Sequence, residues 1–368
     1  MTTLTVQVEQ LWVPDSLGDD DAADFLAVVD VARQVRIATW GNDDLAYSPE
    51  EFLESFDDPY ERLVVLVARV DSRIVGRVGI SMPLADNTDT AIVSLEILPE
   101  CQGRGVGREL LEAAEQFARG ELRRTLIVET HHPAAALESV EGSAVTAAQD
   151  GGTLPMSSRE VVFASQAGYA LQRVERFSSC PFPMGREELD GLKSQAAQTA
   201  GPEYAIHTWA DASPAEWVRD MAVLESLLDG EESLSAYEAD EPEHAWDDAR
   251  VREAETLAQA SGRQTMVCAV EHRPTGRLVG FTAISILGHR EDVVFQDETV
   301  VLKEHRGRKL GMLLRVCNLE RLAQEQHAIR KIYTWDAAEK EYMVSVNHAL
   351  GFRAAGYTGE WQKQFDLG

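Results

Sequence analysis

A glycine-rich segment with arginines carries the clearest chemical signal in the sequence. It runs from Gln102 to Gly107, and Arg108 follows it directly. Glycine lets the backbone adopt conformations that a Cβ atom would block, and a helix start leaves N–H donors unpaired. Those donors and the helix dipole favour an anion. The segment is therefore predicted to bind a phosphate or pyrophosphate group, with Arg104 and Arg108 adding positive charge.

The spacing of the glycines excludes two other phosphate-binding loops. A P-loop requires Lys-Ser or Lys-Thr after its last glycine, whereas Gly107 is followed by Arg108 and Glu109. A dinucleotide-binding fingerprint that starts at Gly103 needs a glycine at position 108, where this chain has arginine. The remaining pattern is Gln-x-x-Gly-x-Gly after a strand.

A second copy of the segment lies 204 residues further along the chain. In an ungapped alignment the paired positions are Gln102 with Arg306, Gly103 with Gly307, Gly105 with Lys309 and Gly107 with Gly311. A repeat of this length, with a strand, a loop and a helix at both places, indicates two related domains. The second copy has lost one glycine, and the Cβ atom of Lys309 is expected to narrow its backbone nest.

Strands and helices must position both segments. Hydrophobic runs predict strands over residues 93–98 and 293–302, each leading into one segment. Ser48-Pro-Glu-Glu51 and Ser213-Pro-Ala-Glu216 predict a capping box in each half. The predicted domains span residues 1–185 and 204–368, and a helical linker over 186–203 joins them. Residues 132–158 are an insertion, for which a mobile loop is favoured over a functional lid.

Composition restricts the class of protein. The chain has 368 residues, enough for two domains, and no apolar run approaches the length of a membrane span. The net charge of −28 repels nucleic acid and anionic membranes and would attract a cationic small molecule, although general solubility is the favoured explanation of the charge. Four scattered cysteines without a CxxC pattern predict neither a metal site nor disulfides, and they favour a reducing cytoplasm.

The strand, turn and Gln-x-x-Gly-x-Gly loop resemble the pyrophosphate loop of the GNAT superfamily of acyl-CoA-dependent N-acyltransferases. Residues 334–352 resemble the family segment T-x-N-A-x-x-N-x-x-M-x-x-V-N-x-x-L-G-F. Asp336 and Lys340 replace its first two asparagines, and Asn347 retains the third. The end pattern is similar to tandem-GNAT proteins of actinobacteria, and the two-domain layout resembles that of mycothiol synthase.

This resemblance implies a fold, a co-substrate and a set of binding residues. The fold class is α/β (α+β), with two tandem domains, each a central mixed, mostly antiparallel sheet flanked by helices. Acetyl-CoA is the implied co-substrate, its pantetheine arm lying between two splayed strands. The implied binding residues are Leu95, Glu96, Ile97, Gln102, Gly103, Arg104, Gly105, Val106, Gly107, Arg108, Val300, Val301, Arg306, Gly307, Arg308, Gly311 and Asn347.

In this family an amine attacks the thioester carbonyl directly, so a neighbouring base or a chain of water molecules must take up a proton. The predicted bases are Glu96 in the first half and Glu298, with Asp297 beside it, in the second. His131 and His132 are weaker candidates. Many family members protonate the leaving thiolate with a tyrosine, whose position is occupied by Ala164 in one half and Asn347 in the other.

Two classes of function therefore stay open. The leading hypothesis is an N-acetyltransferase acting on the amine of a small molecule, with either half as the catalytic one. The alternative is a non-catalytic acyl-CoA-binding or regulatory protein, which the missing tyrosines favour. The expected partner is an amine that can carry positive charge, without nucleic acid or membrane, and the chain is expected to be a monomer or homodimer.

Overall fold

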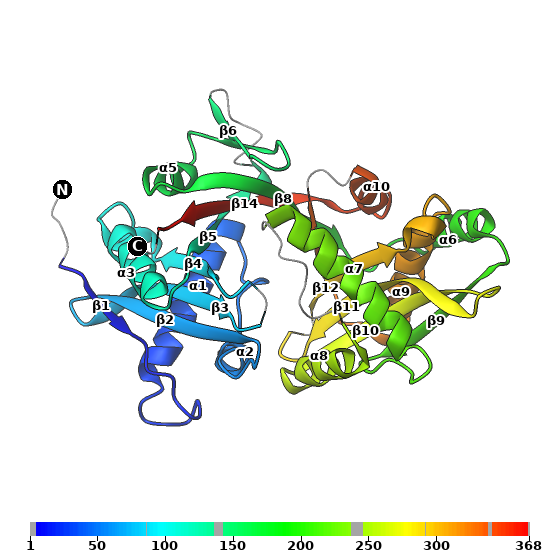
Figure 1. Cartoon of the computed structure of the whole chain (residues 1–368), viewed down its shortest axis with the longest axis horizontal. Helices are drawn as coiled ribbons and strands as arrows, with labels where there is room; N and C mark the ends of the chain where they lie inside the picture. The colour runs from blue at the N-terminus through cyan, green and yellow to red at the C-terminus, as the bar shows by residue number, and fades with distance from the viewer. Residues whose placement is uncertain are drawn as a thin grey trace. The chain divides into compact units, whose positions relative to one another are not determined.

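The computed structural model describes residues 5–85, 87–135, 143–236, 246–290, 292–337 and 341–366. The chain forms two compact units (Figure 1). The first comprises Met1–Glu175 together with Gly356–Gly368, and the second comprises Arg176–Ala355. The domain boundaries predicted from the sequence follow the repeat, whereas these units follow spatial contacts. Among the described residues, no helix is long and apolar enough to cross a membrane.

The sheet of the first unit is ordered β1-β2-β3-β4-β5-β14. Its strands are β1 (Gln7–Gln10), β2 (Glu61–Val70), β3 (Arg73–Pro83), β4 (Thr90–Ile97), β5 (Thr125–Pro133) and β14 (Arg353–Gln364). Strands β4 and β5 are parallel, and the other neighbouring pairs are antiparallel. The mixed, mostly antiparallel sheet predicted from the family resemblance is therefore confirmed.

Helices cover both faces of this sheet. They are α1 (Ala23–Trp40), α2 (Pro49–Glu54), α3 (Val106–Gly120) and α5 (Arg159–Gln166). Successive side chains of a strand point to opposite faces: Glu96 of β4 reaches Arg36 of α1, whereas Leu95 lies near Gly107 of α3. Helices α1 and α3 thus lie on opposite faces, and their apolar residues form one core with the strands between them.

The last strand of the chain completes the sheet of the first unit (Figure 1). Strand β14 pairs with β5 in an antiparallel register that runs from Gly356–Pro133 to Gln364–Thr125. Trp361 is 1% exposed in the core, and its indole N–H donates to the Thr130 hydroxyl over 2.9 Å. The sequence repeat assigns this segment to the second domain, whereas its contacts assign it to the first unit.

Part of the predicted insertion is a packed hairpin. Strands β6 (Ala144–Thr146) and β7 (Thr153–Pro155) pair with each other, and Leu154 is fully buried in the core of the first unit. The Asp150 carboxylate accepts a hydrogen bond from the Val174 amide over 2.7 Å. Residues 143–158 thus form a packed hairpin where a mobile loop was expected, and residues 136–142 lie outside the described part.

The second unit repeats the plan with the strand order β8-β13-β12-β11-β10-β9. Its strands are β8 (Ala170–Pro181), which begins in the first unit, β9 (Tyr204–Ala210), β10 (Arg263–His272), β11 (Arg277–Leu287), β12 (Val293–Val301) and β13 (Lys331–Ala337). Its helices are α6 (Arg186–Ala200), α7 (Val218–Ala236), α8 (Asp248–Ala260), α9 (Leu310–Glu325) and α10 (Glu341–Ala349). Helix α6 coincides with the predicted linker, but it buries Leu189, Ala196 and Ala200 in the core of this unit.

Candidate functional site

The first glycine-rich segment forms an open loop at the start of α3. A short 3₁₀ helix, Pro99–Cys101, follows β4, and α3 begins at Val106, which is 1% exposed. Gly103 and Gly105 have φ angles of +71° and +94°, which favour glycine. A Cβ atom placed on either residue would meet no atom within 4 Å. The loop therefore leaves space beside its backbone for a ligand.

One side chain of the first loop fixes its shape, and two arginines place positive charge beside it. Gln102 Nε2 donates to the carbonyl oxygen of Ile97 over 2.8 Å, and Arg159 donates to Gln102 Oε1 over 2.7 Å. Gln102 thus shapes the loop. Arg104 is exposed and makes no ion pair within the described residues, whereas Arg108 reaches Glu112 over 3.2 Å on the surface. A phosphate group could be bound by Arg104 without breaking an existing pair.

The second loop keeps the same course despite its different residues. Arg306 Nε donates to the carbonyl oxygen of Val301 over 2.9 Å, as Gln102 does to Ile97. Gly307 has a φ angle of +79°. Lys309, at the start of α9, adopts the left-handed conformation with a φ angle of +56°.

Two more residues of the second loop were predicted to bind the co-substrate, Arg308 and Gly311. Arg308 is exposed and lies 3.6 Å from the Glu203 carboxylate. Gly311 is buried in the first turn of α9. Lys309 thus keeps the left-handed conformation that Gly105 has at the paired position of the first loop. Its added Cβ atom was expected to narrow the space formed by the backbone N–H groups of this loop.

Beside each loop, two parallel strands separate. The paired register of β4 on β5 runs from Thr90–Thr125 to Val93–Val128, and β4 then continues to Ile97 along β3. In the second unit the pairs of β12 and β13 end at Phe295–Tyr333. The β4 residues beyond Val93 include the predicted Leu95, Glu96 and Ile97, and those of β12 include Val300 and Val301. Backbone groups on the separated edges are where an extended ligand arm could pair.

Glu96 is held in a buried ion-pair cluster. It is 6% exposed, its carboxylate accepts a hydrogen bond from Arg77, and Arg36 lies 3.4 Å away. Burial raises the pKa of Glu96, but the charges of Arg77 and Arg36 lower it more, so the net pKa lies below its ordinary value. A carboxylate stabilised in this way is a weak proton acceptor. Glu96 stays a predicted base, but its contacts favour a structural role.

Strand β12 has a bulge at the point where it separates from β13. Thr282 of β11 pairs with Thr299, but Ile284 pairs with Gln296, so β12 contains one extra residue in this interval. The extra residue falls at Asp297 and Glu298, and bulges commonly redirect side chains near active sites. In the first unit the register of β3 on β4 is continuous from Gly76–Ile97 to Ser81–Ile92. The two halves therefore differ at this position.

Among the described carboxyl groups of the second unit, Asp297 has the most strongly shifted pKa. It accepts a hydrogen bond from Ser285, while Glu298 is exposed to solvent. Burial and the neighbouring charge of Glu298 raise the pKa of Asp297 to about 7. A carboxyl group with this pKa can exchange a proton near neutral pH, which suits a general base. Asp297 therefore fits a base better than the predicted Glu298.

A buried polar network supports the bulge. Gln296 Nε2 donates to the Thr282 hydroxyl over 2.9 Å, and the Thr282 and Thr299 hydroxyl oxygens lie 2.7 Å apart. Arg315 of α9 donates to Thr299 over 2.9 Å and also to the side chain of Asn347 on α10. Asn347, predicted to bind the co-substrate, is 3% exposed. Its contacts connect α10 to the strand that carries Asp297.

The first unit has acidic side chains that the sequence reasoning missed. Glu360 of β14 lies directly opposite Glu129 of β5, one residue beyond the last β4–β5 pair. Burial raises the pKa of Glu360 to about 7, with Glu175, Glu129 and Asp150 contributing and Arg173 opposing. Only knowledge that the last strand joins the first unit could have identified this pair.

The two predicted histidines are poor bases. Burial and the charge of Arg36 lower the pKa of His131 to about 3. His132 is 3% exposed, and its Nε2 atom lies 2.8 Å from the Thr130 hydroxyl. Burial also lowers the pKa of His132. Both side chains therefore accept a proton reluctantly near neutral pH.

Aromatic rings lie around the point where β12 and β13 separate. Phe177 stacks on Tyr333 with 5.1 Å between centroids, and Phe295 lies 6.0 Å from Trp335. Trp335 is 42% exposed, so part of this cluster faces solvent. Phe295 is two residues from Asp297 in β12. An apolar or cationic group could contact the rings while an attached amine lies near the carboxyl group.

Comparison with known proteins identifies the family of this arrangement. The model of the acetyltransferase (GNAT) family matches residues 29–137 and 231–352, one region in each half. No curated relative matches the sequence. Within the described residues, no group of three or more His, Cys, Asp or Glu side chains could hold a metal ion.

Solved structures share the fold along the whole chain. A tandem GNAT protein from the clavulanic acid biosynthesis pathway, solved without AcCoA, has a TM-score of 0.74 at 22% identity, and the match covers 99% of both chains. A GCN5-related N-acetyltransferase from Sphaerobacter thermophilus has a TM-score of 0.63 at 13% identity, covering 98% of this chain and 97% of that one. At these identities the likeness shows the fold. The tandem arrangement predicted from the sequence is confirmed.

Proposed function

Because the chain belongs to the acetyltransferase (GNAT) family, we propose that it transfers an acetyl group from acetyl-CoA to the amine of a small molecule. Membership of the family supports acyl transfer in general. The observation that carries the proposal is the open loop next to a pair of separating strands in each unit. An anion-binding helix start beside free strand edges suits a ligand with a pyrophosphate and an extended amide-containing arm.

The chain's own groups would bind acetyl-CoA in two places. Backbone N–H groups around Gly103 and Gly105, with Arg104, would hold the pyrophosphate in the first unit. Gly307, Lys309 and the start of α9 would do so in the second. In either unit the free edge of the strand that enters the loop would pair with the pantetheine amides.

We assign the chemical step to the second unit, with Asp297 as the general base. The Asp297 carboxylate accepts a proton from the amine while the nitrogen attacks the thioester carbonyl carbon. The N–C bond forms, and the C–S bond breaks as the thiolate of CoA leaves. Backbone N–H groups freed by the bulge would stabilise the oxyanion. The bulge and the pKa of Asp297 near 7 support this choice.

The first unit is a second candidate because of Glu360. It also has a pKa near 7 and lies beyond the last β4–β5 pair, but its strand β4 has no bulge in the β3–β4 register. In this alternative the second unit would bind acetyl-CoA without turning it over. Variants at Asp297 and Glu360 separate the two assignments.

The proposed acceptor is a small amine that carries positive charge when free. The net charge of −28 attracts cations over long distances, and the aromatic rings around Trp335 can bind a cationic or planar group. We further propose a cytoplasmic monomer or homodimer without nucleic acid or membrane partners.

The first test is calorimetric titration with acetyl-CoA together with an assay for free CoA thiol in the presence of a panel of amines. Binding followed by amine-dependent thiol release supports the transferase. Binding without release on any amine favours a regulatory acyl-CoA-binding protein. Absence of binding would refute both, because the loops would then be structural connections only.

A further inference from the structure

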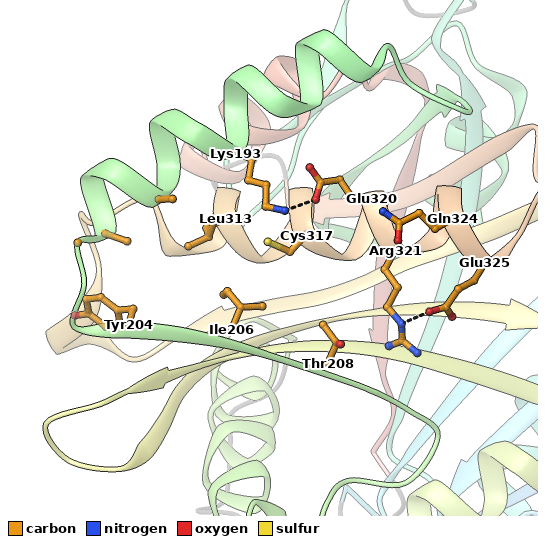
Figure 2. Close-up of a pocket in the computed structure, with 13 residues that line it drawn as sticks. Lys193, Tyr204, Ile206, Thr208, Leu313, Cys317, Glu320, Arg321, Gln324 and Glu325 are labelled. Atoms are coloured by element: carbon orange, nitrogen blue, oxygen red, sulfur yellow. Dashed lines mark hydrogen bonds and ion pairs between the residues drawn. The ribbon is translucent and has the colours of Figure 1, made fainter.

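A pocket away from both loops contains a half-buried thiol. It lies in the second unit between α6, β9 and α9, and its volume is about 640 Å³ (Figure 2). Cys317, in the middle of α9, lines it between Leu313 and Glu320 (Figure 2). Most structural cysteines are inert because they are buried, but this one is accessible from a cavity large enough for a small reagent.

Charged side chains lie around this thiol. Lys193 of α6 donates to the Glu320 carboxylate next to Cys317 (Figure 2). Further along α9, Arg321 donates to Glu325 over 2.8 Å. The pocket is thus polar on the side of Glu320 and Arg321 and apolar around Leu313. A polar reagent such as a peroxide can therefore reach Cys317 along the polar side of the pocket without first crossing an apolar surface.

A second thiol lies behind the first. Cys268 of β10 is fully buried and pairs in register with Thr208 of β9, whose side chain lines the same pocket. Helix α9 packs on β10 here, since Asn318, the residue after Cys317, donates to the Met266 carbonyl over 2.8 Å. Each of the two thiols shifts the pKa of the other, as expected of groups that lie close together. With the packing of α9 on β10, this makes the two thiols neighbours, of which only Cys317 lines the pocket.

We propose that Cys317 and Cys268 form a peroxide-sensitive dithiol site, in which Cys317 reacts first and Cys268 closes a disulfide. This site is independent of acyl transfer. The neighbouring Cys268 thiol and the charge of Lys193 stabilise the thiolate and lower the pKa of Cys317, although burial and Glu320 oppose this. Cys180 is a contrast, because burial raises its pKa to about 11.

The reaction balances with a peroxide as the only other reactant. The Cys317 thiolate attacks one peroxide oxygen, forming an S–O bond as the O–O bond breaks, and the departing hydroxide takes a proton to become water. The Cys268 sulfur then attacks the Cys317 sulfenic acid, forming the S–S bond as the S–O bond breaks. The second oxygen leaves as water with the proton of Cys268. Two electrons pass from the thiols to the peroxide.

The test uses the reduced full-length protein and hydrogen peroxide near neutral pH. After remaining thiols are blocked, non-reducing peptide mapping should find a peptide pair joined through Cys317 and Cys268 and lighter by two hydrogens. Alkylation of the untreated protein should be at least about tenfold faster at Cys317 than at Cys180. In Cys268→Ser, a dimedone adduct should accumulate on Cys317, whereas Cys180→Ser should behave like the wild type.

The wild-type mapping needs no variant, so the result does not depend on whether a substitution folds. The proposal is overturned if Cys317 stays free after peroxide has oxidised other thiols. It is also overturned if alkylation of Cys317 is no faster than that of Cys180. A disulfide from Cys317 to Cys101 that forms as readily as the one to Cys268 would overturn it as well.

Discussion

Arg306 Nε donates a hydrogen bond to the carbonyl oxygen of Val301 over 2.9 Å, and this bond connects the second loop to the end of its strand. Gln102 makes the equivalent bond to Ile97 over 2.8 Å in the first loop. Two different side chains thus perform the same structural task at paired positions of the repeat. The role of both side chains here is to shape the loop.

Replacement of Arg306 tests this role. Arg306→Ala removes a hydrogen bond with a net contribution of about 0.5–1.5 kcal/mol, so acetyl-CoA binding at the second loop should weaken by about two- to tenfold. Arg306→Gln installs the residue of the first loop and should restore most of the affinity. Calorimetry measures both variants. If the glutamine variant binds as weakly as the alanine variant, charge rather than loop shape is the contribution of Arg306.

Gly105, one of the two left-handed glycines of the first loop, provides a second prediction. Gly105→Leu places a side chain where the pyrophosphate is proposed to bind, so acetyl-CoA affinity at this loop should fall more than about tenfold. Gly41→Leu is the matched control, because both glycines have positive φ angles and open space around them. Each variant should lose about 1–2 kcal/mol of stability through backbone strain. Equal affinity in the two variants would remove the first loop from the binding site.

The catalytic assignment is tested by three conservative substitutions. Asp297→Asn should lower kcat/KM by about 10²- to 10⁴-fold, the usual contribution of a general base. Glu298→Gln, at the exposed neighbouring position, should change it only a few-fold. Steady-state kinetics with any accepted amine decides this. A large loss in Glu360→Gln with little change in Asp297→Asn would move the chemistry to the first unit.

The pKa of Asp297 predicts a pH dependence. Because the carboxyl group must be ionised to accept a proton, kcat/KM should rise with pH and level off above an apparent pKa of about 7. This inflection should disappear in Asp297→Asn. The raised pKa also favours the protonated carboxyl group in the folded state, a contribution that is lost as pH rises through about 7. Asp297→Asn should therefore unfold at a higher temperature than the wild type at pH 8, and a lower one would contradict the raised pKa.

The buried ion pairs of Glu96 predict a loss of stability. Glu96→Gln leaves Arg77 and Arg36 without their counter-charge, which should cost about 3–5 kcal/mol in urea unfolding. Glu100→Gln, which removes an exposed pair with Arg73, should change stability by less than about 1 kcal/mol. Because the pKa of Glu96 is lowered, its contribution is present above the ordinary carboxyl pKa and disappears as pH falls through the lowered value. A stable but inactive Glu96→Gln would instead support the predicted base.

Local patterns in the sequence predicted one helix start correctly and the other wrongly. At Ser48 both bonds of the capping box are present, since the Glu51 amide donates to the Ser48 hydroxyl over 3.2 Å and the Ser48 amide to Glu51 over 2.9 Å. Ser213 has the same pattern, but α7 begins at Val218. The Ser213 amide instead donates to Glu255 of α8 over 2.8 Å. A partner 42 residues away in sequence replaced the local one.

In the candidate site, too, features set by neighbours in sequence were predictable and features set by distant partners were not. The glycine positions and the strands beside them were predictable because they depend on neighbours in sequence. The bulge at Asp297 depends on the register of β12 against β11, and the proximity of Glu360 to Glu129 depends on pairing between strands from different halves of the sequence. Such pairings leave no periodic pattern in the sequence. Sequence reasoning therefore did not identify both Asp297 and Glu360 as carboxyl groups with a pKa near 7.

Strand β14 also constrains how the protein is made. Translation delivers residues from the N-terminus onwards, so the residues of the second unit must be synthesised before Trp361 can fill the core of the first unit. Until then the edge of β5 exposes unpaired backbone groups, a surface that invites aggregation. A product that terminates early lacks this strand, however complete its first half. A product that ends before β14 therefore keeps an open β5 edge on its first unit, however well the rest of that unit has folded.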